Sequence, residues 1–496
     1  MAERTLLRAV LEQRGWLSWP VFEMHFTSAA RRVAEQMAVA QMSISQATFK
    51  RWLSGDRDPR SLAGVVLEEM LGVETELLFR PAASHDVVLP RPLHLSSRAA
   101  ALALDTRWAT SLLSPSAPAA GVDGAWRLDG MGLFDGTSVA VQTYEATELT
   151  SGLIGIGPED HPHLRSFVRP LRRALVLGSV GTGPGAGLYV LDAAHARRHL
   201  AVDRPVETLP IPAAYRVDDL TYALLWALIN LDDGLSADDD ALHAETPGLE
   251  QHLTKPRSAV ARAAVPELST VGAAWLGSRL CARHALGQLP EHCEPWALWN
   301  RDSRGEEAAA WLFFRHQHEF VRAARDRISG DRAPLGSAFC VPAAVAKDSP
   351  RYERILLFLA VAWMELRGLV TWVCAEPEYA QADGVVLVPG QRAVVTNWLR
   401  TNDVCQVDVT DRKARVRGYE DAVDHARTHT VADGATQPER LRALADYLEL
   451  DWPWLNRRCR ELGEYGAVDM LRPRSRLITL DEVDHVLDFV GNIGST

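Results

Sequence analysis

The sequence predicts a multi-domain α+β protein in which an N-terminal all-α bundle is followed by a larger mixed α/β region and a helical C-terminus. Three observations lead to this fold class. Apolar residues recur at helical spacing up to about residue 80. Short apolar or alternating runs between glycine-rich turns begin near Trp126. Helical periodicity returns after residue 412, and a chain of 496 residues is long enough for about two to four domains.

The N-terminal bundle is predicted from the spacing of its apolar side chains. The inward face of its longest helix carries Phe22, Phe26, Ala29, Ala30 and Val33. The expected helices of this bundle span residues 4–15, 19–37, 38–42, 45–54 and 61–71.

The segment 43–59 carries the strongest functional signal of the chain. Ser45 suits a helix N-cap, because its hydroxyl can accept a hydrogen bond from a free N–H of the next turn. Phe49, Trp52 and Leu53 recur at helical spacing and can bury one side of the helix. Gly55 ends this helix and Pro59 blocks its continuation. The helix start and the opposite side are mostly polar or basic: Gln46, Ala47, Thr48, Lys50 and Arg51.

This run, SISQATFKRWLSGDRDP, resembles the recognition-helix segment of the Cro/phage-repressor (XRE) family of helix-turn-helix proteins, in the style of large actinobacterial regulators. The resemblance covers about residues 18–80 and continues through residues 61–72 and 77–79. The chain departs from the family pattern at Val39, where Ala is usual, and at Ser43, where Gly is usual. Small residues at these positions let the two helices approach closely. The departures therefore point to a shifted first helix or a longer turn.

The resemblance implies a sequence-specific transcriptional regulator that binds double-stranded DNA. Gln46 and Thr48 would then reach base edges from the first turn of the recognition helix, beside Ser45 and Ala47. Four basic residues would hold phosphates: Lys50, Arg51, Arg57 and Arg60. Because one such module makes few contacts, we expect a homodimer on a two-fold operator by analogy with the family.

The charge distribution is compatible with this interpretation. The chain carries a formal net charge of −11, but residues 26–60 hold six basic and three acidic residues. A modest basic surface on an acidic protein suits a regulator that avoids indiscriminate DNA binding, and it excludes a nucleoid-coating protein.

Cysteine usage and hydropathy predict a cytoplasmic protein with no membrane partner. The six cysteines include no C-x-x-C pair, which is typical of a reducing compartment. The first residues lack the apolar region of a signal peptide. The longest apolar run, residues 355–364, is about half a membrane span and is followed by Glu365 and Arg367.

The rest of the chain is expected to divide by composition. Residues 1–80 form the helix-turn-helix domain, and 81–124 form a linker with one helix at 97–113. Residues 125–240 form a mixed β/α region, with strands at 138–144, 174–177 and 188–191, a helix at 218–231 and an acidic loop at 232–240. Residues 241–266 form a second, partly mobile linker. Residues 267–412 form an α/β sensor or effector domain with helices over 267–330. Residues 413–496 form a helical C-terminal region.

Four local patterns suggest other chemistry, and each has a simpler explanation. The glycine-rich run 178–187 favours a hairpin or surface loop over a nucleotide loop, because a strand pattern and not a helix follows it. The pairs His161/His163 and His316/His318 favour solvated histidines over a metal site. Cys281, His284, His292 and Cys293 have the right types for zinc but an irregular spacing. Residues 440–459 faintly resemble a second helix-turn-helix with Arg457 and Arg458, and Trp452 and Trp454 are expected in the core.

Two other function classes stay open at this point. The N-terminal bundle could bind another protein and no operator, which would make the chain an interaction hub. Residues 336–412 could alternatively process a ligand or bind an unidentified small-molecule effector. Because no G-x-S-x-G, H-E-x-x-H or Walker pattern is present, we expect neither an enzyme nor a bound cofactor or metal.

Overall fold

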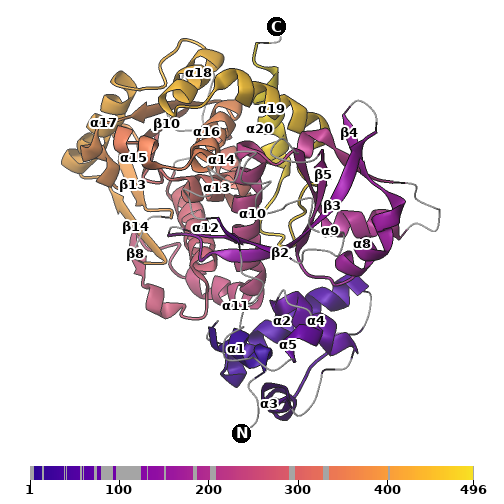
Figure 1. The fold of residues 1–496 in the computed structure, drawn as a ribbon. Helices are drawn as coiled ribbons and strands as arrows, with labels where there is room; N and C mark the ends of the chain where they lie inside the picture. The colour runs from indigo at the N-terminus through magenta and orange to yellow at the C-terminus, as the bar shows by residue number, and fades with distance from the viewer. Residues whose placement is uncertain are drawn as a thin grey trace. The chain divides into compact units, whose positions relative to one another are not determined.

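A computed structural model describes most of the chain. The described residues are 5–13, 16–37, 40, 42–55, 59, 61–71, 75–79, 93–95, 124–130, 132–149, 152–181, 187–201, 208–289, 297–327, 335–399 and 403–494. They divide into two compact units, Met1–Asp129 with Gly136–Val217, and Gly130–Asp135 with Asp218–Thr496. The predicted fold class is confirmed: N-terminal helices precede a mixed region with two mixed sheets, and helices follow (Figure 1).

The N-terminal helices enclose an apolar core made of the side chains that the sequence places inward. Phe22, Phe26 and Val33 are buried there together with Phe49 and Trp52. The helices are α1 (Leu6–Gln13), α2 (Trp19–Met37), α3 (Gln46–Ser54), α4 (Ser61–Leu71) and α5 (Thr75–Leu78).

The short helix expected at residues 38–42 is wrong. Ala40 and Met42, the residues of that range that the structure describes, are not helical. Eight residues separate the end of α2 at Met37 from the start of α3 at Gln46. Met42 and Ile44 are half-buried against the helical core, whereas Ser43 and Ser45 are exposed. This alternation is the pattern of an extended segment, which can place every second side chain in the core without forming a helix.

The first unit also contains a seven-stranded mixed sheet. Its order is β1-β2-β3-β4-β7, with β5 paired to β3 and β6. The predicted hairpin in the glycine-rich run is confirmed, since β5 and β6 are antiparallel with Val180 opposite Gly187. The strand β1 lies within the expected linker 81–124, whose expected helix at 97–113 lies outside the described residues. The elements are β1 (Leu93–Leu95), β2 (Gly124–Leu128), β3 (Thr137–Glu148), β4 (Leu153–Ile156), η1 (Pro158–Asp160), α8 (His161–Val168), β5 (Ala174–Val180), β6 (Gly187–Asp192), α9 (Ala193–Leu200), β7 (Leu209–Pro212) and η2 (Ala213–Tyr215).

The second unit is built on another seven-stranded sheet, in the order β11-β10-β9-β12-β13-β14-β8. The strands β9, β10 and β11 are parallel, and the pairs from β9 through β12, β13 and β14 to β8 are antiparallel. The strands are β8 (Arg257–Val260), β9 (Ala297–Asn300), β10 (Leu335–Cys340), β11 (Leu369–Cys374), β12 (Val385–Val388), β13 (Arg392–Thr396) and β14 (Cys405–Thr410).

Helices of the second unit pack on this sheet and on one another (Figure 1). Val416, Val423 and Ala426 of α17 join the apolar core on one sheet face. The other helices include α12, which contacts β13 and β14, and α16, which contacts β11. The helices are α10 (Asp219–Ala237), α11 (Asp239–Glu250), η3 (Arg262–Ala264), α12 (Thr270–Gln288), α13 (Gly305–Phe313), α14 (Arg315–Arg325), α15 (Ala343–Asp348), α16 (Arg351–Leu366), η4 (Pro377–Gln381), α17 (Lys413–Thr428), α18 (Gln437–Tyr447), α19 (Trp452–Tyr465) and α20 (Asp481–Asn492). None of the helices that the structure describes is long and apolar enough to cross a membrane.

The acidic loop expected at residues 232–240 is instead helical, with a break at Asp238 between α10 and α11. Its carboxylates are not all solvated. Asp232 is fully buried and accepts hydrogen bonds from the backbone N–H groups of Arg474 and Ser475. Asp238 accepts from the N–H and hydroxyl of Ser269 at 2.8 and 2.5 Å. Partners distant in sequence therefore satisfy these acids, so the acidic composition does not require a loop. The expected linker 241–266 likewise holds most of α11, then β8 and η3.

Candidate functional site

The helix α3 has the local structure that its sequence predicts. The Ser45 hydroxyl accepts a hydrogen bond from the Thr48 N–H at 3.3 Å and caps the N-terminus. Gly55 ends the helix with φ of 72°, a left-handed conformation that glycine adopts without a steric penalty. Its N–H donates to the carbonyl groups of Arg51 and Trp52. Both ends of α3 are therefore determined by its own residues.

Aromatic packing determines which side of α3 faces the core. The Phe49 ring stacks on that of Phe22, with centroids 4.1 Å apart, and lies 5.7 Å from Trp19. The Trp52 ring lies 6.0 Å from that of Phe26. Phe49 and Trp52 are each only 2% exposed. Since all three of these partners belong to α2, this helix sets the orientation of α3.

The predicted contact residues lie at the start of α3 and on its outer side. Thr48 is half-buried. The exposed ones are Ser45, Gln46, Ala47, Lys50 and Arg51. Arg57 and Arg60 lie outside the described residues. The structure thus places six of the eight predicted site residues together on α3 and its N-cap, and five of the six are exposed.

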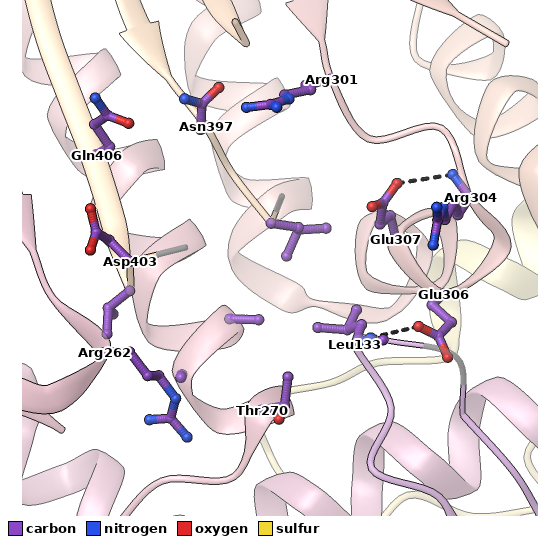
Figure 2. Close-up of a pocket in the computed structure, with 15 residues that line it drawn as sticks. Leu133, Arg262, Thr270, Arg301, Arg304, Glu306, Glu307, Asn397, Asp403 and Gln406 are labelled. Atoms are coloured by element: carbon purple, nitrogen blue, oxygen red, sulfur yellow. Dashed lines mark hydrogen bonds between the residues drawn. The ribbon is translucent and has the colours of Figure 1, made fainter. Parts of the chain in front are cut away.

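The second unit contains a pocket of about 530 Å³ (Figure 2). Its walls come from the chain after β8, β9 and β13, the start of β14 and the first turns of α12 and α13. The strand pairing explains this convergence. The C-terminal ends of β8, β9 and β13 and the N-terminal end of β14 all lie along the same side of the sheet, where the strands end. The charged lining residues are Arg262, Arg301, Arg304, Glu306, Glu307 and Asp403.

The polar side chains that line the pocket differ in exposure and in the hydrogen bonds that they form with other parts of the protein. The Arg262 guanidinium donates to the carbonyl groups of Val265 and Leu268, so it has a structural role. Asn397 accepts from the Gly384 N–H at 2.9 Å and is 3% exposed. Arg304, by contrast, is exposed. In Figure 2 the side chain of Arg301 extends toward that of Asn397, with Gln406 nearby on β14.

Three carboxylates surround the start of α13. Glu307 accepts from the N–H groups of Ser303 and Arg304 at 2.6 and 2.9 Å. Glu306 accepts from the Leu133 N–H at 2.6 Å, which holds Leu133 in the pocket wall. Burial, assisted by the nearby Glu306 carboxylate, raises the pKa of Glu353 to about 7. The N-terminal end of α13 is therefore already supplied with acidic partners from the protein.

The sequence did not reveal this pocket. Single arginines at irregular spacing carry no recognisable motif, and only the strand order brings them together. The expected ligand segment 336–412 supplies part of the lining, including Asn397, Asp403 and Gln406. The remaining residues come from chain positions between 132 and 307.

The expectation of solvated histidines is wrong for several of them. His316 and His318 in α14 are 7% and 5% exposed, and burial lowers their pKa values to about 3 and 4. His316 forms a 2.7 Å hydrogen bond with the Ser278 hydroxyl, whereas His318 packs against Trp363. Apolar neighbours on two sides of α14 remove both rings from water. His161 is likewise buried, at the start of α8.

The cysteines and histidines considered as zinc ligands form hydrogen bonds within the protein where the structure describes them. Among the described residues, no group of three His, Cys, Asp or Glu side chains could hold a metal ion. His284 bonds to the Lys255 carbonyl at 2.8 Å, and the buried Cys281 thiol donates to the Asn397 carbonyl; His292 and Cys293 lie outside the described residues.

The faint second helix-turn-helix does not present its central arginine to solvent. Arg458 is 5% exposed and pairs with Asp218 and Glu461. Trp452 and Trp454 are only half-buried, and the Trp454 ring lies 4.6 Å from the Arg351 guanidinium carbon. These two tryptophans therefore lie at the edge of the core.

Comparison with known proteins adds no relative. No family model, curated protein or solved structure matches the chain.

Proposed function

We propose that the chain is a sequence-specific, DNA-binding transcriptional regulator that places α3 in the major groove. One observation carries this proposal. The helix is anchored by Phe49 and Trp52 on one side, while Gln46, Lys50 and Arg51 are exposed. A rigid, short helix with an exposed polar and basic side has the dimensions and chemistry that the major groove accepts.

The positions on α3 suggest a division of roles. Gln46 lies in the first turn, where a side chain enters the groove most deeply, and its amide can pair with adenine. The Thr48 methyl can pack on a thymine methyl. Lys50 and Arg51 carry the positive charge that phosphates require, and they would set the register of the helix on the duplex.

Binding to a two-fold operator as a homodimer belongs to the same proposal. One module of this size offers few base contacts, so two copies would be needed for useful specificity. Regulation would then come from the remaining chain, which is several times longer than the N-terminal helices.

A second candidate function has one observation in its favour. The connection between α2 and α3 is eight residues long. The turn between the two helices of a standard helix-turn-helix has about three to four residues, so this connection is longer. A bundle that retains the packing of α3 but binds a protein partner would tolerate this change.

The deciding experiment is selection from a random duplex library with the full chain, followed by sequencing. We expect enrichment of one short motif by the wild type and its loss in Lys50→Ala/Arg51→Ala. The control is Arg8→Ala, which removes an exposed arginine of α1 and should retain the motif. If the folded wild type enriches nothing, the interaction-hub function replaces the regulator.

A further inference from the structure

The pocket of the second unit lies where α/β sheets characteristically bind ligands. From β9 the chain continues to β10 and β11 on one side of β9, and then returns to β12 on the other side. Such a reversal of strand order leaves a crevice outside the carboxyl end of the first strand. Arg301 and Arg304 follow β9 at this edge, and both line the pocket.

The size and polarity of the pocket limit what could fill it. A volume of about 530 Å³ lies in the usual range of small-molecule sites, about 300–1,000 Å³. Its walls carry three guanidinium and three carboxylate groups, so the formal charges of the lining residues cancel. A multiply charged anion would gain little from such a balanced set of charges.

The local hydrogen bonds exclude one familiar mode of binding. Phosphates bind at a helix N-terminus when its N–H groups are available. Here Glu307 already accepts the N–H groups of Ser303 and Arg304. The negative charge of Glu307 would also repel a phosphate. The start of α13 is therefore unsuited to a nucleotide.

Guanidinium groups remain as the anion-recognising element. Arg304 is exposed at the pocket, and Arg301 is held by a 3.1 Å hydrogen bond from its Nη2 to Gln381. Guanidinium groups match the planar geometry of a carboxylate and can bind it with two hydrogen bonds. The Gln406 amide, exposed on β14, can donate to or accept from further polar groups.

We propose that this pocket binds a small polar carboxylate, such as a free amino acid or hydroxy acid, whose carboxylate lies against Arg301 and Arg304. A second polar group of the ligand would meet Gln406 and the acidic wall. The overall charge of such a ligand, zero or −1, matches the balanced lining.

The test measures ligand binding alone and needs no DNA. Thermal unfolding of the full chain is recorded with millimolar free amino acids, hydroxy acids, inorganic phosphate and AMP in separate samples. We expect at least one amino or hydroxy acid to raise the Tm. Calorimetric titration of that compound should then give a Kd that rises about tenfold or more in Arg304→Gln and Arg301→Gln. Arg417→Gln, which changes an exposed arginine on α17, is the matched control and should bind as the wild type does.

Three results would overturn the proposal. Stabilisation by phosphate or AMP alone would assign a different ligand class. A Kd unchanged in both pocket variants would place the bound carboxylate elsewhere. No stabilisation by any amino or hydroxy acid would reject the class. Since Arg304 is exposed, its variant is expected to fold, and its Tm without ligand checks this. The proposed DNA-binding function could fail without affecting any of these measurements.

Discussion

Phe49 in α3 stacks on Phe22 in α2 with ring centroids 4.1 Å apart and an interplanar angle of 25°. This contact joins the exposed, polar helix to the longest N-terminal helix. Because both rings are almost fully buried, the stacking determines which residues of α3 remain in solvent.

Replacing Phe49 with alanine should destabilise the N-terminal helices by about 3–5 kcal/mol, since it removes a large buried ring. Phe49→Leu keeps most of the volume and should cost about 1 kcal/mol. Amide hydrogen exchange in α2 to α4 measures the effect, and the alanine variant should accelerate it about a hundredfold or more. Equal exchange in the two variants would show that this stacking does not hold α3.

Arg51→Ala and Gln46→Ala should weaken DNA binding in different ways. Loss of the Arg51 charge should lower affinity for all sequences and reduce the slope of log K against log salt by about one. Loss of the Gln46 amide should cost about 1–3 kcal/mol at one base pair. Titrations of both variants on the selected motif and its single-base mutants distinguish these effects. A uniform loss in both variants would contradict this division of roles.

The buried ion pair between α16 and α18 should dominate the stability of that helix contact. Arg440 donates to both oxygens of Glu365 at 2.9 and 2.6 Å, and the Glu365 side chain is only 1% exposed. Arg440→Met leaves this carboxylate buried and unpaired, so it should cost about 3–5 kcal/mol in urea unfolding. The control Arg457→Met removes an exposed partner of Glu461 and should cost about 0.5 kcal/mol or less. Similar losses in the two variants would argue against a special role for burial.

Glu353 should make the second unit less stable as the pH rises from about 4.5 to 7. Burial raises its pKa to about 7 in the folded state, from 4.5 in the unfolded chain, so the folded protein retains the proton longer. The stabilisation is complete below pH 4.5 and is lost as the pH rises through the folded pKa, with a total of about 3 kcal/mol.

Comparing the unfolding free energies of Glu353→Gln and the wild type across this window isolates the effect. The variant should gain stability relative to the wild type as the pH rises. Glu378→Gln, which changes an exposed glutamate, should keep the wild-type pH profile. Parallel profiles for Glu353→Gln and the wild type would mean that Glu353 titrates normally.

The buried thiols should resist alkylation in the native protein. Burial raises the pKa of Cys405 to about 11 and raises those of Cys281 and Cys459 as well. The reactive thiolate is therefore scarce at neutral pH, and the protein excludes the reagent. Iodoacetamide labelling followed by peptide mass spectrometry should find these three cysteines unmodified until guanidinium chloride unfolds the chain. Rapid labelling of the native protein at any of the three would refute their burial.

Local sequence was sufficient to predict the candidate DNA-contacting helix. The Ser45 cap, the Gly55 end and the Phe49/Trp52 side depend on residues within a few positions of one another. The helix spacing also predicted α2 and α4. The prediction failed at residues 38–42, because packing of Met42 and Ile44 on the core outweighed local helix propensity.

Burial of polar residues was beyond the reach of sequence patterns. Asp232, His316 and His318 have the composition of solvated surface, yet each is buried. Their environments depend on elements far along the chain, such as the backbone N–H groups of Arg474 and Ser475 for Asp232. No local sequence pattern predicts such distant partners.

By itself the sequence determined the order of helical and strand-rich regions and the polarity of α3, because helix caps and side-chain periodicity act between near neighbours. Only the tertiary structure decided where the pocket lies and which residues line it. Strand order and register bring Arg262, Arg301 and Gln406 to one edge of a sheet. Those pairings join segments more than a hundred residues apart, so they depend on the packing of the whole unit and not on any local pattern.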